Sequence, residues 1–409
     1  MVAVKSSVNW GSMEGAPKWY GKGTPYTKLN FPFSEEEELE LDRYCEKIKE
    51  NISKDKMTPW ERWNATIKGE EVDTINVHLH PETTYSIKVL DGYANAIKPI
   101  DSFRNPKLFL KAHLATAARF APHNLQVYSY SYGEAEWGGK AKLLDLAHPV
   151  MVEPSVKTMD DVDRLVVPDP KKDGTYPGML WAIKKMKELF KKNGLAGIVP
   201  ILPSCCTPAE WIIPECVRGL KLGFLDAIKN PDMWHAMMKK TTEFEIRFAQ
   251  ALWEAGGDYV WCCQHHSAWP PDIFKERIAP YCAELAKRGP LDSWYYAANQ
   301  ETHVQIMADA GGYDPCKYLF FTTDTPVEFA RQFTKSIDKA YVCCEPDKAL
   351  LTDLPTLEAT VKEHIKIGTS IPGVGFAMAA GAIDYWTPPQ NVDAFVKYVK
   401  EYGKSPTKP

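Results

Sequence analysis

Short runs of β-branched and aromatic residues alternate with longer amphipathic stretches from Thr58 to the C-terminal region. Such runs are typical of buried strands, and apolar residues spaced three or four apart are typical of the helices that cover them. The pattern predicts eight strands, at Thr74 to His78, Gln126 to Tyr130, Gly197 to Leu202, Tyr259 to Cys263, Ser293 to Ala297, Tyr318 to Thr322, Ala340 to Cys344 and Gly373 to Met378. Eight strands alternating with helices predict an α/β fold with a single (β/α)8 TIM barrel.

The longer amphipathic stretches predict the helices between these strands. They cover Asp232 to Glu254, Ile273 to Lys287, Thr302 to Ala310, Val327 to Ser336 and Leu357 to Ile367. An open, doubly wound sheet is the alternative arrangement, but it calls for a glycine-rich phosphate-binding turn after the first strand. The sequence His78-Leu79-His80-Pro81 is not such a turn, and no low-complexity linker divides the chain.

The first 55 residues lack this alternation. A Gly/Pro/aromatic stretch from Trp10 to Phe33 precedes an acidic helical run from Ser34 to Lys54, in which Ser34 and four glutamates form a good helix start. We expect residues 1–55 to form an N-terminal extension packed on a barrel of residues 56–409. The oligomeric state is not predicted, although the aromatic side chains of this arm suit an interface with a second copy of the chain.

Charge and composition restrict the class of partner. The 49 basic and 53 acidic residues give a net charge of −4 and are mixed along the chain. We therefore expect no nucleic-acid partner, since there is no basic stripe to follow a phosphate backbone. No segment approaches the roughly 20 apolar residues that span a bilayer, and residues 1–25 lack a signal-peptide run, so we expect a cytoplasmic protein with no membrane partner.

Three pairs of adjacent cysteines stand at predicted strand ends: Cys205-Cys206, Cys262-Cys263 and Cys343-Cys344. Neighbouring residues on a strand point to opposite faces, so adjacent cysteines rarely bond to each other. We expect reduced thiols. A barrel gathers its chemistry at the C-terminal ends of its strands, where histidines, carboxylates and tyrosines accompany these thiols. Such a set of residues predicts a metal site or an acid/base catalytic site that acts on a small-molecule substrate.

Four motifs in order resemble the uroporphyrinogen decarboxylase superfamily across about residues 57 to 403. They are Thr58-Pro59-Trp60-Glu61-Arg62 followed by Gly69-Glu70, then Pro231-Asp232, Met307-Ala308-Asp309-Ala310-Gly311, and Thr387-Pro388-Pro389-Gln390-Asn391-Val392. Each motif alone is weakly specific, and their order and spacing together are more so. The resemblance implies a barrel and one of two chemistries, porphyrinogen decarboxylation or corrinoid-linked methyl transfer.

Substitutions at the family positions separate these chemistries. The decarboxylase branch has an arginine-rich loop after its first strand for the substrate carboxylates, whereas residues 78–83 here contain no arginine. The branch that methylates cofactor thiols has a His-x-Cys strand and a later Cys that bind zinc, and the matching positions here are Tyr295, Ala297 and Gly381. The remaining relatives transfer a methyl group from a donor to a separate corrinoid protein, as anaerobic O-demethylases do.

The resemblance and the strand-end residues together give our expected site. Cys343 matches the Asn of the family's Gly-Asn-x-Asp-Pro element, and Glu345 matches its Asp. We predict a metal, zinc by its ligand types, at His266, Cys343 and Glu345, with His265 and Asp324 as catalytic residues. Substrate contacts are predicted at Trp269, Tyr295, Tyr296, Asn299 and Glu134. Core packing for the thiols and helix capping for the carboxylates are the alternative roles.

The sequence leaves three functions open. The first is O-demethylation of a methoxylated aromatic compound, with the methyl group passed to the cobalt(I) of a separate corrinoid protein. The second is a decarboxylase for another acid, which Glu134, Asp324 and Arg104 around a carboxylate pocket would favour. The third is a subunit that binds the corrinoid protein without catalysis, which an apolar rim without clustered polar groups would favour.

Overall fold

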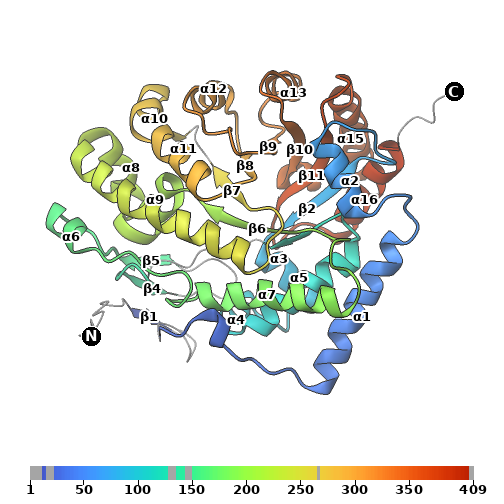
Figure 1. Cartoon of the computed structure of the whole chain (residues 1–409), viewed down its shortest axis with the longest axis horizontal. Helices are drawn as coiled ribbons and strands as arrows, with labels where there is room; N and C mark the ends of the chain where they lie inside the picture. The colour runs from blue at the N-terminus through green and yellow to red at the C-terminus, as the bar shows by residue number, and fades with distance from the viewer. Residues whose placement is uncertain (1–11, 15–22, 128–134, 143–149, 265–267, 405–409) are drawn as a thin grey trace.

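Eight parallel strands form the centre of the computed structural model, which describes residues 12–14, 23–127, 135–142, 150–264 and 268–404 (Figure 1). In spatial order these strands are β2 (Asn76–Pro81), β11 (Phe376–Ile383), β10 (Ala340–Pro346), β9 (Tyr318–Thr322), β8 (Ser293–Tyr296), β7 (Trp261–Gln264), β6 (Ile201–Cys206) and β3 (Leu125–Val127). The backbone amide of His123 donates to the carbonyl of Val77 at 2.8 Å, so the segment entering β3 returns to β2. The sheet is a nearly closed barrel, and the predicted (β/α)8 fold is confirmed.

Helices surround this barrel, and Trp63 of α2 packs into the cluster inside it. They are α1 (Glu35–Ile52), α2 (Pro59–Ile67), α3 (Thr83–Leu90), α4 (Pro99–Arg104), α5 (Pro106–Phe120), α6 (Met159–Arg164), α7 (Tyr176–Lys192), α8 (Leu220–Lys229), α9 (Pro231–Glu254), α10 (Pro271–Arg277), α11 (Ala279–Arg288), α12 (Glu301–Asp309), α13 (Val327–Ser336), α14 (Asp347–Leu350), α15 (Leu354–Gly368) and α16 (Pro389–Tyr402), with the short helices η1 (Tyr26–Lys28) and η2 (Pro208–Arg218).

Each of the eight barrel strands is largely buried on both faces. On β10, Ala340, Val342 and Cys344 belong to the cluster inside the barrel, whereas Tyr341 and Cys343 belong to the cluster between the sheet and the helices. Strands buried on two sides are nearly continuous apolar runs, which explains why all eight were predictable from composition. Most bounds differ by a few residues. For example, β11 begins at Phe376 rather than at Gly373, whose φ of +75° is outside the extended region.

One predicted helix is divided in the structure. The stretch Ile273 to Lys287 was expected to be a single helix, but α10 ends at Arg277 and α11 begins at Ala279. Pro280, in the first turn of α11, has no amide hydrogen to continue the ladder of the preceding helix. Ile278 takes a non-helical conformation between them, so the chain changes direction at this point.

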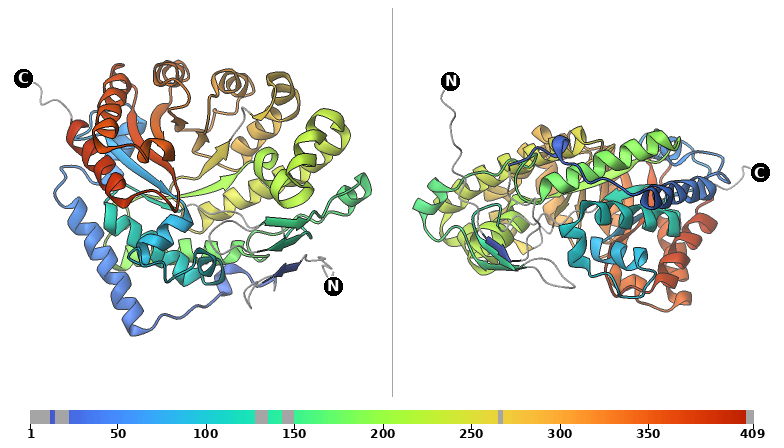
Figure 2. Two further views of the ribbon diagram at one scale, coloured as in Figure 1. Left: turned by 180° about the vertical axis from the view of Figure 1, so that it is seen from behind. Right: turned by 90° about the horizontal axis from the view of Figure 1, so that it is seen from below.

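Helix α1 and the described segment before it, from residue 23, lie along the outside of the barrel (Figure 2). Ser34 caps α1 in a reciprocal hydrogen-bonded box with Glu37, as its sequence predicted, and α1 packs against α5 and α7. A three-stranded sheet was not predicted. It joins β1 (Ser12–Glu14), β4 (Lys140–Lys142) and β5 (Val150–Glu153), whose three or four residues are too short to show an alternation.

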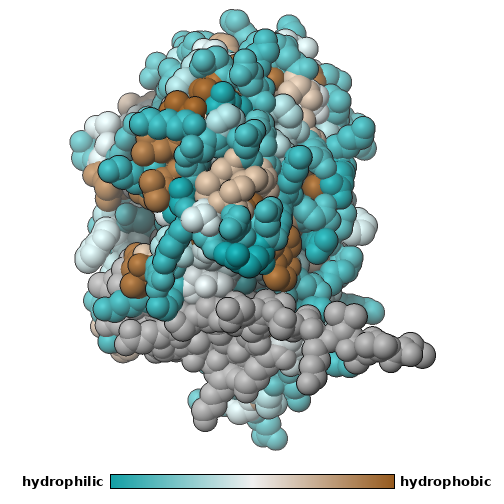
Figure 3. Space-filling model, turned by 90° about the vertical axis from the view of Figure 1, so that its left-hand side faces the viewer, coloured by the Kyte–Doolittle hydropathy of each residue, from teal (hydrophilic) through white to brown (hydrophobic). Residues whose placement is uncertain are grey.

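The described surface carries scattered rather than continuous apolar areas on the side of α6 and α8 (Figure 3). Leu220, Leu222 and Ile228 of α8 are among the exposed hydrophobic side chains there. Isolated apolar side chains are normal on a folded protein. None of the described helices combines the length and the apolar character that crossing a membrane requires.

Candidate active site at the C-terminal face of the barrel

The inward-facing side chains near the C-terminal ends of the strands form a largely buried layer that we call the barrel floor. It consists of His80, Cys206, Cys263, Tyr295, Cys344 and Gly381. Cys206 and Cys263 are register partners on neighbouring strands, as are Cys263 and Tyr295. The ring of His80 lies 4.6 Å from that of Trp261 and 5.2 Å from that of Tyr295, measured between centroids. The floor therefore combines thiols, a phenol, an imidazole and aromatic faces.

Tyr295, Cys344 and Gly381 meet at one point of this floor. A Cβ atom built on Gly381 would lie 2.3 Å from the Cys344 Sγ and 2.9 Å from the Tyr295 hydroxyl oxygen. The Tyr295 hydroxyl hydrogen-bonds the Cys344 thiol. Positions 295 and 381, predicted to match zinc ligands of the thiol-methylating branch, are thus neighbours in space. Here they hold a phenol and a bare glycine, and the thiol of Cys344 occupies the space beside them.

The floor carries little charge at neutral pH. Burial lowers the pKa of His80 and that of His78, one layer deeper, to about 3, so both imidazoles are neutral near pH 7. Burial, together with the charge of Glu345, raises the pKa of the Cys344 thiol. None of the eight barrel strands, within the described residues, contains Lys or Arg. This floor suits a neutral aromatic ligand better than a polyanion.

The structure places several predicted site residues away from the floor. Tyr296 points to the helix layer, where its hydroxyl lies 2.5 Å from that of Tyr313. Trp269 stacks on Phe224 at 4.6 Å in the same layer. Asn299 is exposed, and its side-chain oxygen accepts a 3.2 Å hydrogen bond from the amide of Glu301 at the start of α12. These contacts are packing and capping contacts.

Asp324 follows β9 at the rim, where it forms an ion pair with Lys348. Cys343 and Glu345 are together, but on the outer face of β10, where His364 of α15 joins them. His364 was not among the predicted site residues, although its spacing from Val361 and Leu357, both buried on α15, indicated the face toward the sheet. His265, His266 and Glu134 lie outside the described residues, and their roles stay predictions.

A buried carboxyl group lies behind the wall of the site. Glu245 of α9 is fully buried, and its neighbours include the outward thiols of Cys205 and Cys262. Burial raises the pKa of Glu245 well above its usual value. The folded state retains the proton of Glu245 at pH values where the unfolded chain has released it. Protonated Glu245 therefore contributes fully to the stability of the fold below about pH 4.5, and this contribution is lost as the pH rises toward the folded-state pKa.

We expect the unfolding free energy of the wild type, relative to Glu245→Gln, to fall as the pH rises above about 5 toward the raised pKa of Glu245. The slope should approach about 1.4 kcal/mol per pH unit, the value for one proton. Urea unfolding at several pH values measures this difference. Glu243→Gln is the matched control, because the net effect of Arg288 and Arg247 lowers the pKa of Glu243 against its partial burial, so its contribution is constant over this range. A flat difference for Glu245→Gln would show that Glu245 is ionised in the folded protein.

The sequence model of the uroporphyrinogen decarboxylase family matches residues 58–402. The chain belongs to this family. Among curated relatives, it is 26% identical to the uroporphyrinogen decarboxylase of Trichlorobacter lovleyi over 181 residues, which are 41% of this chain and half of that protein. It is 25% identical to that of Carboxydothermus hydrogenoformans over 270 residues, 61% of this chain and 70% of the other.

A solved methyltransferase from Methanosarcina mazei has the same fold. Its TM-score is 0.69 at 21% identity, and the match covers 85% of this chain and 99% of that one. The resemblance inferred from the four motifs is confirmed, and these motifs have structural roles here. Thr58 and Glu61 form the capping box of α2, and Arg62 is buried beside Asp73 just before β2.

Proposed function

We propose that this chain is a methyltransferase that removes the methyl group of a methoxylated aromatic compound and passes it to a separate corrinoid protein. The carrying observation is the uncharged, aromatic barrel floor. A decarboxylase for a porphyrinogen-like acid needs cations for several carboxylates, whereas these strands supply neutral imidazoles, thiols and rings. Family membership and the fold shared with a methyltransferase support the proposal.

The chemistry of the proposed reaction assigns a task to the floor. The partner's corrinoid would supply the cobalt(I) nucleophile that takes the methyl group. As the methyl carbon–oxygen bond breaks, its electron pair stays on the ether oxygen, which must be held and protonated. We assign this task to the Tyr295 hydroxyl, because a phenol can donate its proton to the departing phenolate oxygen. The nearby rings of Trp261 and His80 would hold the aromatic substrate.

The barrel floor supports activation of the ether oxygen by a metal less well than proton donation by Tyr295. Among the described residues, three metal-binding atoms gather only at Cys343, Glu345 and His364, on the other face of β10. Zinc held by Cys343 and Glu345 would therefore not touch a substrate on the floor. The proposal includes His265 as a catalytic residue and His266 as a metal ligand. It also includes a separate corrinoid protein as the partner.

The direct test mixes the purified chain, without oxygen, with a cobalt(I) corrinoid protein and a panel of methoxylated aromatics. We expect loss of the cobalt(I) absorbance together with release of the demethylated phenol. If no donor reacts with a corrinoid partner that accepts methyl groups from another enzyme, the methyltransferase proposal is wrong. Release of carbon dioxide from carboxylated aromatics in the same panel would instead establish the decarboxylase alternative.

A further inference from the structure

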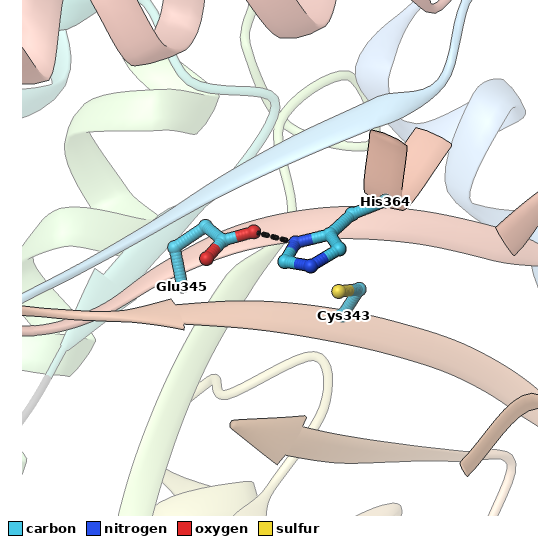
Figure 4. A group of neighbouring side chains, drawn as sticks. All are labelled: Cys343, Glu345 and His364. Carbon is cyan, nitrogen blue, oxygen red and sulfur yellow. Dashed lines mark hydrogen bonds and ion pairs between the residues drawn. The ribbon is translucent and has the colours of Figure 1, made fainter. Parts of the chain in front are cut away.

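The outer face of β10 and the inner face of α15 bring together three groups of a kind that binds metals. Cys343 and Glu345 are two residues apart and so share the face of β10 that points away from the barrel interior. His364 reaches this face from α15 (Figure 4). One ligand atom from each of the three residues lies within 4.8 Å of the other two. A thiolate, a carboxylate and an imidazole are the donors that zinc prefers.

Hydrogen bonds and packing hold these groups in place. The Nδ1 atom of His364 is hydrogen-bonded to one carboxylate oxygen of Glu345. The other carboxylate oxygen accepts a 3.3 Å hydrogen bond from the Thr323 hydroxyl. Cys343 and Glu345 are completely buried, and the His364 side chain is 15% exposed. These side chains are already ordered, so binding a cation here would cost little additional conformational entropy.

The local charge is negative. Glu363 and Glu328 act on His364 in addition to Glu345, and together they raise its pKa against the lowering effect of burial. Burial and the charge of Glu345 raise the pKa of the Cys343 thiol. Without a metal, the raised pKa means that Cys343 stays protonated. A divalent ion would favour the thiolate instead, because its charge stabilises the thiolate directly and offsets that of the buried carboxylate.

We propose that Cys343, Glu345 and His364 bind a divalent metal ion of the zinc type, and that this ion joins β10 to α15. Three protein ligands leave one tetrahedral position for water. Because the site is separated from the barrel floor by the strand itself, the ion does not contact the substrate. The proposal is independent of the proposed function, since it requires no methyl transfer.

Cobalt(II) substitution and metal analysis test this site in the full chain. We expect the wild type to retain zinc after dialysis, to unfold at a higher temperature with zinc than after chelation, and to show a sulfur-to-cobalt charge-transfer absorption when loaded with cobalt(II). Cys343→Ser should abolish this absorption and weaken zinc binding by at least about 100-fold, since even an outer partner of a metal site is worth about 10- to 100-fold. His364→Gln should weaken binding similarly.

Cys344→Ser is the matched control, because Cys344 is the next residue of the same strand, is equally buried and faces the barrel interior. It should retain both the absorption and the zinc-dependent stabilisation, and circular dichroism checks that each variant is folded. A wild type without the charge-transfer absorption would overturn the proposal and leave a metal-free pair between Glu345 and His364. An absorption lost in Cys344→Ser but retained in Cys343→Ser would overturn it too, and would place the metal on the barrel floor.

Discussion

Tyr295→Phe is expected to lower the rate of methyl transfer from a methoxylated aromatic compound by about 10²-fold or more, with little change in KM. Removing the hydroxyl leaves the aromatic ring, its contact with His80 and its packing against Trp261 in place. The hydrogen bond to the Cys344 thiol is lost together with the proton donor for the departing oxygen. General acid catalysis is worth about 10²- to 10⁴-fold. Single-turnover loss of the cobalt(I) absorbance, at saturating donor, measures the rate.

The neighbouring residue supplies the control for this experiment. Tyr296→Phe removes the same hydroxyl group one position along β8, where it points outward and bonds the hydroxyl of Tyr313. This variant should lose about 1 kcal/mol of unfolding free energy, the typical contribution of one buried hydrogen bond, and retain the wild-type rate. Equal rates for Tyr295→Phe and the wild type would remove Tyr295 from the mechanism and direct attention to His265.

Arg62→Leu is expected to destabilise the fold by about 3 to 5 kcal/mol. The Arg62 side chain is completely buried, and its guanidinium donates to both carboxylate oxygens of Asp73, at 2.7 and 2.9 Å. It also donates to Asp55 at 3.1 Å and to the carbonyl of Met57 at 2.9 Å. Leucine would leave the carboxylates of Asp55 and Asp73, which are 20% and 12% exposed, without their buried cation. Breaking a buried pair costs more than the pair contributes.

Urea unfolding compares this variant with Arg119→Leu. Arg119 also forms a two-pronged pair, with Asp393, but the two side chains are 46% and 40% exposed. Exposed pairs contribute about 1 kcal/mol or less because water screens them. A loss for Arg62→Leu no larger than that for Arg119→Leu would mean that water solvates the remaining carboxylates, and that Arg62 does not anchor the segment before β2.

The sequence alone determined the elements whose signals are local. Apolar runs indicated the eight barrel strands, and Ser34 with the glutamates that follow it marked the start of α1. The family motifs were recognisable for a similar reason, since Thr58, Glu61 and Arg62 fix the segment before β2 through short-range contacts. The three-stranded sheet escaped prediction because its strands are only three or four residues long, and because β1 pairs with residues of β4 more than 100 positions away.

Only the tertiary structure decided which strand-end residues meet. A barrel strand is buried on both faces, so its apolar pattern does not reveal which alternate residues point inward. The sequence therefore favoured Cys343 for the active site, whereas Cys344 faces Tyr295 on the barrel floor and Cys343 faces His364. Side chains from β8, β10 and β11, or from β10 and α15, become neighbours only when the barrel closes and its helices pack, and no local pattern encodes that proximity.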